Sequence, residues 1–396
     1  MAPEQPGAEP GPPPRGFPAS EFEARLERAQ RRMREAGLAA LLLTTEPEVR
    51  WFSGFLTPFW QSPTRPWFLV VPARGKPVAV IPGIGAECMG RTWIEDIRTW
   101  SSPDPEDDGV SLLAATLGEV AGAGPVGLPM GPETHLRMPL NDFARLRGAL
   151  AGVAFTDATA LIRALRSVKS EAEVAKIRFA AQAASAAFAR VPEILAPGLS
   201  ERACFRAFRI TALEAGLDDV AYLVGGARPG GYGDIISPPS GRVLTPGDVL
   251  ILDVGGVHDG YYCDFDRNFA VGEVADDARR AHDVVWQATE AGLAAARPGA
   301  TCADLFHAMQ GVMAVDGAAD ANVGRLGHGL GMQLTEFPSI TPWDRTVLEP
   351  GMVLTLEPGM TFAPGAMMVH EENIVIREDG AELLTVRAPR EMPVIG

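Results

Sequence analysis

The segment Ile251–Gly272, ILDVGGVHDGYYCDFDRNFAVG, has the pattern of two apolar strands joined by a tight turn. Asp259 followed by Gly260 is a strong signal for a two-residue hairpin loop. Counting back from this loop along both strands places Asp253 opposite Asp266. The sequence therefore predicts a hairpin with an acidic pair inside an otherwise apolar environment.

Asp264 falls on the same face of this hairpin as Asp253, one pair along, because side chains alternate between the two faces of a strand. Three carboxylates on one buried face repel each other, and a divalent cation relieves that repulsion by binding carboxylate oxygen. A loop one residue longer would reverse the register. The alternative interpretation is one buried, hydrogen-bonded aspartate with two aspartates that face solvent.

Two further acids stand next to apolar strand patterns. Glu357 closes MVLTLEP, and Glu371 lies within MVHEENIVI. A carboxylate in such a strand is costly unless it is paired or metal-bound. Because side chains alternate, Glu371 faces one way while His370 and Glu372 face the other, and periodicity does not settle which set faces the site.

His328 lies in the glycine-rich run GHGLGMQLTEFPSI, residues 327–340. Its neighbours Gly327 and Gly329 permit a close backbone approach, which suits a structural turn as well as a ligand. Four acids and one imidazole are nevertheless suitable donors for a pair of divalent ions that share carboxylates.

The chain of 396 residues is too long for one ordinary core, so two domains are expected. We expect a disordered proline-rich leader at 1–16, an α/β domain at 17–162 and a metal-binding domain at 163–396. Ser20 followed by Glu23 has capping-box spacing and predicts the start of the first helix there.

Helical patterns in the second domain alternate with pairs of apolar strands. Two helices followed by a strand pair occur twice, which indicates a duplicated α+β unit. The helices are expected at 171–195, 200–216, 275–297 and 302–315.

The charge balance is acidic, with 35 basic and 50 acidic residues and a formal net charge of −15. It argues against a nucleic-acid or anionic-membrane partner. No run approaches the roughly 18–20 apolar residues that span a bilayer. The four scattered cysteines and the absence of a signal-peptide pattern favour a cytoplasmic protein.

The window WFSGFLTPFWQSPTRPWF contains three of the seven tryptophans. Packing of a core or an edge strand is one interpretation. The other is an aromatic substrate-binding wall formed by Trp60 and Trp67 with Arg65, which would suit a cationic ligand group.

These motifs together resemble a known family. Asp253 and Asp264 eleven residues apart, then GHGLG, LEPGM and an acid before an apolar strand, resemble the pita-bread metallopeptidases: methionine aminopeptidase, Xaa-Pro aminopeptidase, prolidase and creatinase. The resemblance covers most of residues 165–390, and the first domain resembles the creatinase-type N-terminal domain more weakly. It implies an α+β fold whose pita-bread domain follows an α/β domain.

The resemblance also implies the site. Two divalent metal ions (Mn, Fe, Co or Zn) would be bound by Asp253, Asp264, His328, Glu357 and Glu371, with Asp264 and Glu371 bridging them. The ions would activate a water for attack on an amide C–N bond of a short peptide or small amide, and Glu357 would also serve in catalysis. A homodimer is implied, in which the neighbouring N-terminal domain overhangs the site.

Two departures from the family pattern concern the substrate. Peptidases of the family usually carry histidines at the positions of Ile236 and Thr335, and those histidines handle the scissile amide. Thr335 donates a hydrogen bond but does not titrate near neutral pH. In a peptidase, an acid such as Glu336 or Glu372 would have to substitute for the missing histidines.

Two alternatives to peptide hydrolysis therefore stay open. One is an enzyme acting on a small zwitterion, as an ectoine- or creatine-type hydrolase or a dimethylsulfoniopropionate lyase-like protein. The other is a catalytically inactive binding protein, which would have no reason to retain five costly ligands.

Overall fold

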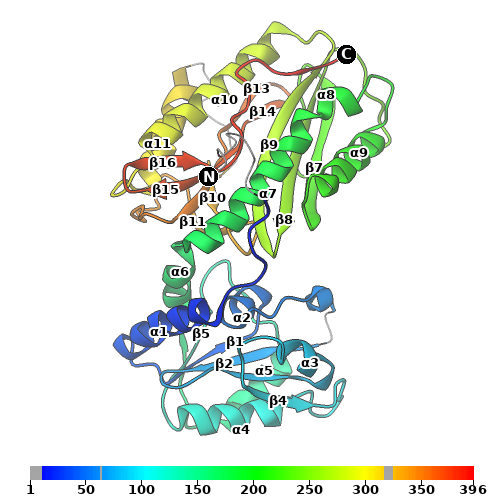
Figure 1. Cartoon of the computed structure of the whole chain (residues 1–396). Coiled ribbons are helices and arrows are strands. Elements are labelled where there is room, and N and C mark those ends of the chain that lie inside the picture. The colour runs from blue at the N-terminus through cyan, green and yellow to red at the C-terminus, as the bar shows by residue number, and fades with distance from the viewer. Residues whose placement is uncertain (1–10, 63–64, 316–323) are drawn as a thin grey trace, which may run out of the picture. The chain divides into compact units, whose positions relative to one another are not determined.

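The computed structural model divides the chain into two compact units (Figure 1). Arg15–Arg166 form the first, and the described residues of Ser167–Gly396 with residues 11–14 form the second. The predicted boundary between residues 162 and 163 falls within helix α6 (Thr159–Ser167). Most of the predicted leader, residues 1–10, lies outside the described part of the chain. The structure describes residues 11–62, 65–315 and 324–396.

The first unit is a mixed six-stranded sheet in the order β4-β3-β2-β1-β5-β6, with helices packed on it. Its central strands β1 and β2 are buried throughout, and Leu113 and Leu146 of helices α4 and α5 pack in the same core as Leu42 and Val70. The strands are β1 (Ala40–Leu43), β2 (Phe68–Pro72), β3 (Val78–Pro82), β4 (Asp96–Trp100), β5 (Val126–Leu128) and β6 (Phe155–Asp157). The helices are α1 (Ala19–Glu35), α2 (Glu46–Ser53), α3 (Ala86–Met89), α4 (Val110–Ala121), α5 (Leu140–Ala149) and α6.

The second unit contains sheets in the orders β17-β9-β8-β7 and β11-β10-β12-β15-β16, and the pair β13-β14. Helices α7 and α9 precede the hairpin β8-β9, and helices α10 and α11 precede the strands around β12 and β15, so the predicted duplicated α+β arrangement is present (Figure 1). The helices are α7 (Glu171–Ala189), α8 (Val191–Ile194), α9 (Glu201–Glu214), α10 (Asp276–Ala295) and α11 (Cys302–Val315).

The strands of the second unit supply the residues of the site. The first sheet consists of β7 (Asp219–Pro229), β8 (Asp248–His258), β9 (Tyr261–Val271) and β17 (Val394–Ile395). The second consists of β10 (His328–Gly329), β11 (Glu336–Ser339), β12 (Val353–Leu356), β15 (Glu372–Arg377) and β16 (Gly380–Leu383). The remaining pair is β13 (Gly359–Ala363) and β14 (Ala366–Val369).

Helix α7 begins with a capping box, whereas helix α1 does not have the capping box that the sequence predicts. Ser170 caps α7 in a full capping box with Glu173. The box predicted at Ser20 is wrong. A cap at Ser20 would start the helix at Glu21, whereas helix α1 begins two residues earlier, at Ala19 after Pro18, so Ser20 lies inside the first turn and makes no cap.

A reciprocal pair of hydrogen bonds helps to join the two larger sheets of the second unit. The backbone amide of Asp264 on β9 donates to Asn373 Oδ1 on β15 at 3.0 Å, and Asn373 Nδ2 donates back to the Asp264 carbonyl. This reciprocal pair is buried. It fixes the strand that carries Asp264 beside the strand that follows Glu371.

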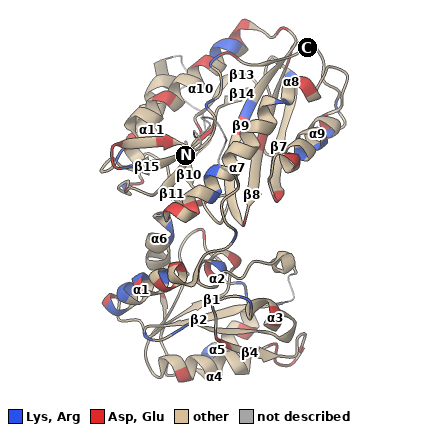
Figure 2. Cartoon of the chain, in the orientation of Figure 1, with Lys and Arg blue, Asp and Glu red and all other residues tan. Residues whose placement is uncertain are grey.

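Charged residues of both signs are interspersed along helices such as α1 and α9 (Figure 2). The predicted acidic excess is therefore not a uniform coat on these helices. Among the described residues, no helix is long and apolar enough to cross a membrane.

Candidate metal centre

The hairpin β8-β9 has the predicted loop and register. Asp259 and Gly260 have φ of 46° and 74°, the left-handed conformations that a tight hairpin turn requires. Asp253 pairs with Asp266, and Asp264 pairs with Gly255 two positions along. Asp253 and Asp264 therefore share one face, as the sequence predicts.

All five predicted metal ligands line one pocket of about 220 Å³ in the second unit. Asp253 comes from β8, Asp264 from β9 and His328 from β10, whereas Glu357 directly follows β12 and Glu371 directly precedes β15. The other lining residues are Tyr222, Ile235, Ile236, Arg325, Leu334, Thr335, Gly359 and Val369.

Three of the five residues already form a compact donor set. One donor atom from each of Asp264, His328 and Glu371 lies within 4.8 Å of the others. His328 Nε2 is 3.4 Å from Asp264 Oδ2 and 3.8 Å from Glu357 Oε1. Three segments spread over more than 100 residues of the chain thus bring oxygen and nitrogen donors to one point.

The orientation of His328 leaves a lone pair facing these carboxylates. Its Nδ1 lies 2.8 Å from the carbonyl oxygen of Gly329. Because a carbonyl only accepts hydrogen bonds, Nδ1 carries the proton and Nε2 is the unprotonated nitrogen. A metal-ligating histidine is typically oriented in this way.

The glycines on both sides of His328 are needed for close packing between strands. A Cβ at Gly327 would lie 2.3 Å from the carbonyl oxygen of Thr355, and one at Gly329 would lie 2.3 Å from that of Phe337. Neither backbone can move without disturbing β10. The glycines therefore set the position of His328 within the sheet.

The carboxylates lie close together, with Asp264 and Glu371 buried and Asp253 and Glu357 half-buried. Burial raises the pKa of Asp253, Asp264 and Glu371 well above the usual range, and their mutual repulsion raises the pKa of Asp253 and Glu371 further. Burial also raises the pKa of Glu357 and lowers that of His328. Without a cation, the charged form of this cluster is unfavourable.

Two carboxylate oxygen atoms of the cluster are available to bind a cation. Within residues 11–62, 65–315 and 324–396, Asp253 Oδ1 and Glu371 Oε1 are buried without a hydrogen-bond partner. Such atoms cost free energy unless something binds them. Buried carboxylate oxygens beside an unprotonated imidazole nitrogen fit first-row divalent ions.

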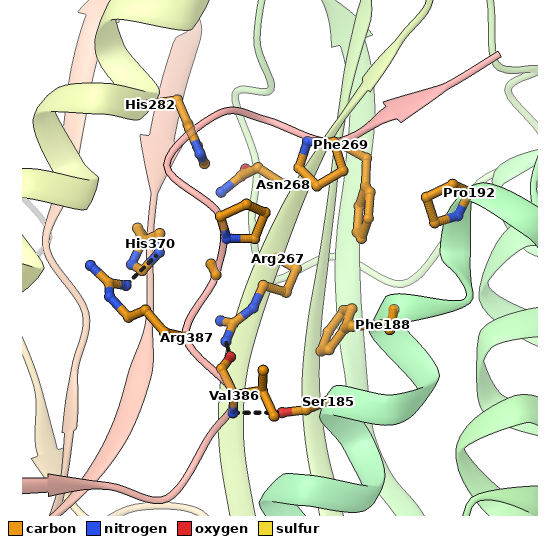
Figure 3. Close-up of a pocket in the computed structure, with 14 residues that line it drawn as sticks. Ser185, Phe188, Pro192, Arg267, Asn268, Phe269, His282, His370, Val386 and Arg387 are labelled. Atoms are coloured by element: carbon orange, nitrogen blue, oxygen red, sulfur yellow. Dashed lines mark hydrogen bonds between the residues drawn. The ribbon is translucent and has the colours of Figure 1, made fainter.

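Glu372 faces away from the pocket, which resolves the choice that periodicity left open. Its carboxylate accepts hydrogen bonds from Arg267 Nη2 and Arg387 Nη1, each at 2.9 Å, and from the Ala388 amide at 3.0 Å. Figure 3 shows both guanidinium groups in a separate cavity of about 300 Å³ behind the strand. These contacts hold Glu372 outward, so Glu371 on the opposite face points into the pocket with the other predicted ligands.

The same cavity holds His370, which the alternation places with Glu372. His370 Nε2 lies 3.1 Å from Arg387 Nη1 (Figure 3). His370 Nδ1 lies 3.0 Å from Thr289 Oγ1. Arg387 is only a donor, so Nε2 accepts and Nδ1 carries the proton. His370 is thus occupied in the packing behind the site.

The residues at the two histidine positions lie in the pocket, whereas the acids proposed to substitute for the histidines do not. Thr335 and Ile236 line the pocket, whereas Glu336 is not one of its lining residues. The Glu336 carboxylate lies 3.2 Å from Lys169 Nζ, and the two side chains are almost fully buried. The structure therefore brings Thr335 to the ligands and does not bring Glu336 or Glu372 there.

Sequence reasoning missed Arg325, which lines the pocket. Its Nη2 donates to Thr335 Oγ1 at 3.3 Å, and its Nε lies 3.6 Å from Glu357 Oε1. The only available signal was an arginine three residues before His328, in a segment without periodicity.

The aromatic window packs inside the first unit. Trp60 and Trp67 are 7% and 1% exposed, their ring centroids are 6.0 Å apart, and both rings contact Phe55. Arg65 Nη1 donates to Ser102 Oγ at 3.4 Å. Core packing accounts for these rings, and their role in substrate binding stays a prediction.

Comparison with known proteins identifies both units. The model of the creatinase/prolidase N-terminal domain matches residues 25–168, and that of metallopeptidase family M24 matches residues 175–378. A probable dipeptidase PepE of Mycobacterium tuberculosis is 32% identical over 385 residues, which are 96% of this chain and 98% of the relative.

Solved structures of similar proteins have the same fold. The crystal structure of dipeptidase PepE from Mycobacterium ulcerans is 30% identical, with a TM-score of 0.84 over 96% of this chain and 99% of that one. A prolidase from Thermococcus sibiricus, 23% identical, shares the fold with a TM-score of 0.85 over 94% of this chain and 99% of that one. The chain therefore belongs to metallopeptidase family M24 and is a hydrolase with a creatinase-type N-terminal domain.

Proposed function

We propose that this chain is a dinuclear-metal-dependent dipeptidase that hydrolyses the amide C–N bond of short peptides. The observation that carries the proposal is the convergence of four carboxylates, two of them buried and two half-buried, and one imidazole on a single pocket, with two carboxylate oxygens lacking partners among the described residues. A relative that this chain matches over 98% of the relative's length is named a probable dipeptidase. That name supports a peptide substrate.

Asp253, Asp264, His328, Glu357 and Glu371 would hold the two ions. Bound divalent ions supply Lewis acidity, which lowers the pKa of a water and polarises a substrate carbonyl. The chain's contribution is a fixed donor set, because each ligand comes from a strand or directly adjoins one. A donor set held by strands is more precise than one held by loops.

Glu357 is the best-placed proton carrier. Its side chain is 23% exposed, against 7% for Asp264 and 3% for His328, so it is the most accessible of these three. Glu357 would take a proton from the attacking water and deliver it to the leaving amine.

Thr335 would orient the substrate rather than titrate. Its hydroxyl oxygen accepts from Arg325, which leaves the hydroxyl hydrogen available to a substrate carbonyl. This role needs no histidine at the position.

A small zwitterionic substrate is the second candidate, and one observation favours it. Thr335 and Ile236, at the two positions where the family's peptidases usually carry histidines, both line the pocket. The pocket wall at these positions therefore offers a hydroxyl and an aliphatic group to the substrate.

The test is a metal-reconstituted activity screen of dipeptides, including Xaa-Pro dipeptides, against ectoine, creatine and betaine or sulfonium compounds. We expect turnover of dipeptides only. Activity on a zwitterion with no cleavage of any peptide would replace this proposal with the second candidate. Metal analysis of the active protein, expected to give two ions per chain, tests the dinuclear centre.

A homodimer and a cytoplasmic location are also proposed. The four cysteines are free thiols, which suits a reducing compartment. Sedimentation of the purified protein checks the dimer, and a monomer at micromolar concentration would contradict it.

A further inference from the structure

The cavity of about 300 Å³ behind strand β15 is separate from the metal pocket, and no described residue lines both. Its floor is buried, with Asn268, Phe269 and His282 at most 3% exposed. Exposed residues such as Ala189 and Val386 line its mouth. Because a cavity of about 150 Å³ accepts benzene, this one has room for an aromatic ring with a substituent.

The charged groups in the wall of this cavity are already balanced. Arg267 pairs with the carboxylate of Glu372, and Arg387 pairs with the carboxylates of Glu372 and Glu290. Both Nη atoms of Arg267 donate hydrogen bonds, and so do Nε and both Nη atoms of Arg387. These groups therefore leave no unbalanced charge that would select an anion or a cation.

The uncharged polar side chains of the wall differ in one respect. Asn268 donates to the carbonyl of Val369, and Ser185 accepts from the amide of Val386. By contrast, neither ring nitrogen of His282 has a hydrogen bond of ordinary geometry to the described residues. A buried polar group in this state costs free energy, which a ligand that pairs with it recovers.

The imidazole of His282 offers the cavity both a donor and an acceptor. Burial lowers its pKa from 6.5 to about 4, so the ring is neutral at neutral pH. A neutral imidazole has one N–H and one lone pair. The carbonyl of Pro389 acts on the ring as an acceptor, which favours a free lone pair on the other nitrogen.

The rest of the wall suits a flat apolar body. The rings of Phe188 and Phe269 are nearly parallel, with an angle of 23° and 6.3 Å between centroids. Figure 3 shows His282 directed from helix α10 toward Asn268, and the two phenylalanines on the side of helix α7. The wall is completed by Pro192, Pro389 and Pro393. Aromatic faces of this kind favour an aromatic ligand.

We propose that this cavity is a second binding site of the chain, for a small neutral phenol whose hydroxyl group pairs with His282. A phenolic hydroxyl both donates and accepts, so it can pair with either tautomer of the imidazole. It stays uncharged at neutral pH, because the phenolic pKa is about 10. This site goes beyond the proposed peptidase function and does not depend on it.

The experiment measures binding of three ring compounds to the metal-loaded full-length protein by ligand-detected NMR. The probes are p-cresol, toluene and p-toluate, which share a methylated ring and differ in carrying a hydroxyl group, no polar group or a carboxylate. His282→Phe removes the pairing nitrogens and keeps a ring. Ala189→Trp adds bulk at the mouth of the cavity. Ala186→Trp is the matched control, because Ala186 is exposed on the same helix α7 and does not line the cavity.

We expect the wild type and Ala186→Trp to bind p-cresol about 3- to 10-fold more tightly than toluene, the effect of one hydrogen bond. Binding of p-toluate should be the weakest of the three. His282→Phe should bind p-cresol and toluene equally. Ala189→Trp should weaken p-cresol binding at least about 10-fold, because the indole blocks entry.

Three results would overturn the inference. The first is a wild type that binds p-cresol no more tightly than toluene, and the second is a wild type that binds p-toluate best. The third is equal p-cresol affinity in Ala189→Trp and Ala186→Trp, which would place the phenol elsewhere on the molecule. If His282→Phe does not fold, these three comparisons still decide the outcome.

Discussion

The charged carboxylate of Glu371 destabilises the metal-free fold, whereas the same charge favours metal binding. The side chain is buried, its Oε1 has no partner among the described residues, and repulsion from neighbouring acids adds to the burial that raises its pKa. In the metal-free protein the charged group is a defect, and only a bound cation reverses that.

Glu371→Gln should therefore stabilise the metal-free protein and disable the metal-loaded one. The amide keeps the volume and removes the buried charge, so the metal-free Tm should rise by a few degrees, since about 1 kcal/mol shifts Tm by roughly 2–4 °C at this size. Metal affinity and activity should fall more than about 100-fold. Metal analysis, calorimetry and the dipeptide assay measure the three effects.

The control for Glu371 is Glu378→Gln, at an exposed position just beyond the end of β15. It should change none of the three quantities. A Glu371→Gln protein with full metal content and full rate would contradict the site assignment.

At the scale of elements, local signals predicted most of the second unit. Helices α9 and α10 begin one residue after and end two residues before their predicted limits, and α11 has the predicted limits. The expected helix at 171–195 is α7 followed by the short α8. The hairpin register followed from Asp259-Gly260 because that dipeptide readily adopts two consecutive left-handed conformations. These features depend on residues close together in the sequence.

The features that could not be predicted depend on distant segments. Alternation left two choices for Glu371, and the choice is made by Arg267 and Arg387, which bind Glu372 behind the strand. Arg325 likewise has no sequence pattern, and its contact with Glu357 exists only because β10 lies beside β12.

The buried ion network behind β15 should contribute strongly to stability. Glu372→Gln removes the charge that balances two guanidinium groups, Arg267 and Arg387. We expect a loss of about 3–5 kcal/mol in the free energy of unfolding, since the buried Arg267 loses its paired carboxylate, whereas Arg387 keeps its pair with Glu290. Urea unfolding measures it. Glu382→Gln, which breaks partly exposed pairs, should cost less than about 1 kcal/mol. Equal losses in the two variants would refute this account.

The position of β10 should depend on its glycine. Gly329→Ala places a methyl group 2.3 Å from the carbonyl oxygen of Phe337. The strands must separate, which should cost about 1–3 kcal/mol and displace His328 enough to weaken metal binding. Thermal unfolding and metal affinity are the measurements.

Gly311→Ala is the matched control. Gly311 lies within helix α11, and a methyl group there would meet nothing within 4 Å. This variant should gain about 0.5–1 kcal/mol from helix propensity, with metal affinity unchanged. A Gly329→Ala protein as stable as the wild type would show that β10 tolerates the added atom.

For the whole molecule, two classes of buried groups give opposite pH dependences. Buried acids such as Asp266 have a raised pKa, so the metal-free fold loses stability as pH rises through their folded-state values. Buried histidines have a lowered pKa and act the other way. A comparison of two variants separates the classes, because every group that is not mutated cancels.

His282 provides that comparison, since burial lowers its pKa from 6.5 to about 4. Between these values the unfolded chain binds a proton that the fold does not, so stability is lost as pH falls from about 6.5 towards 4. Relative to wild type, metal-free His282→Gln should lose about 2 kcal/mol less between pH 7 and pH 4.5, measured by urea unfolding. His307→Gln, at an exposed position of α11, should follow the wild type throughout. If the His282→Gln and wild-type curves stay parallel across this range, His282 is not held neutral in the fold, and the acid sensitivity of the molecule must come from its other buried groups.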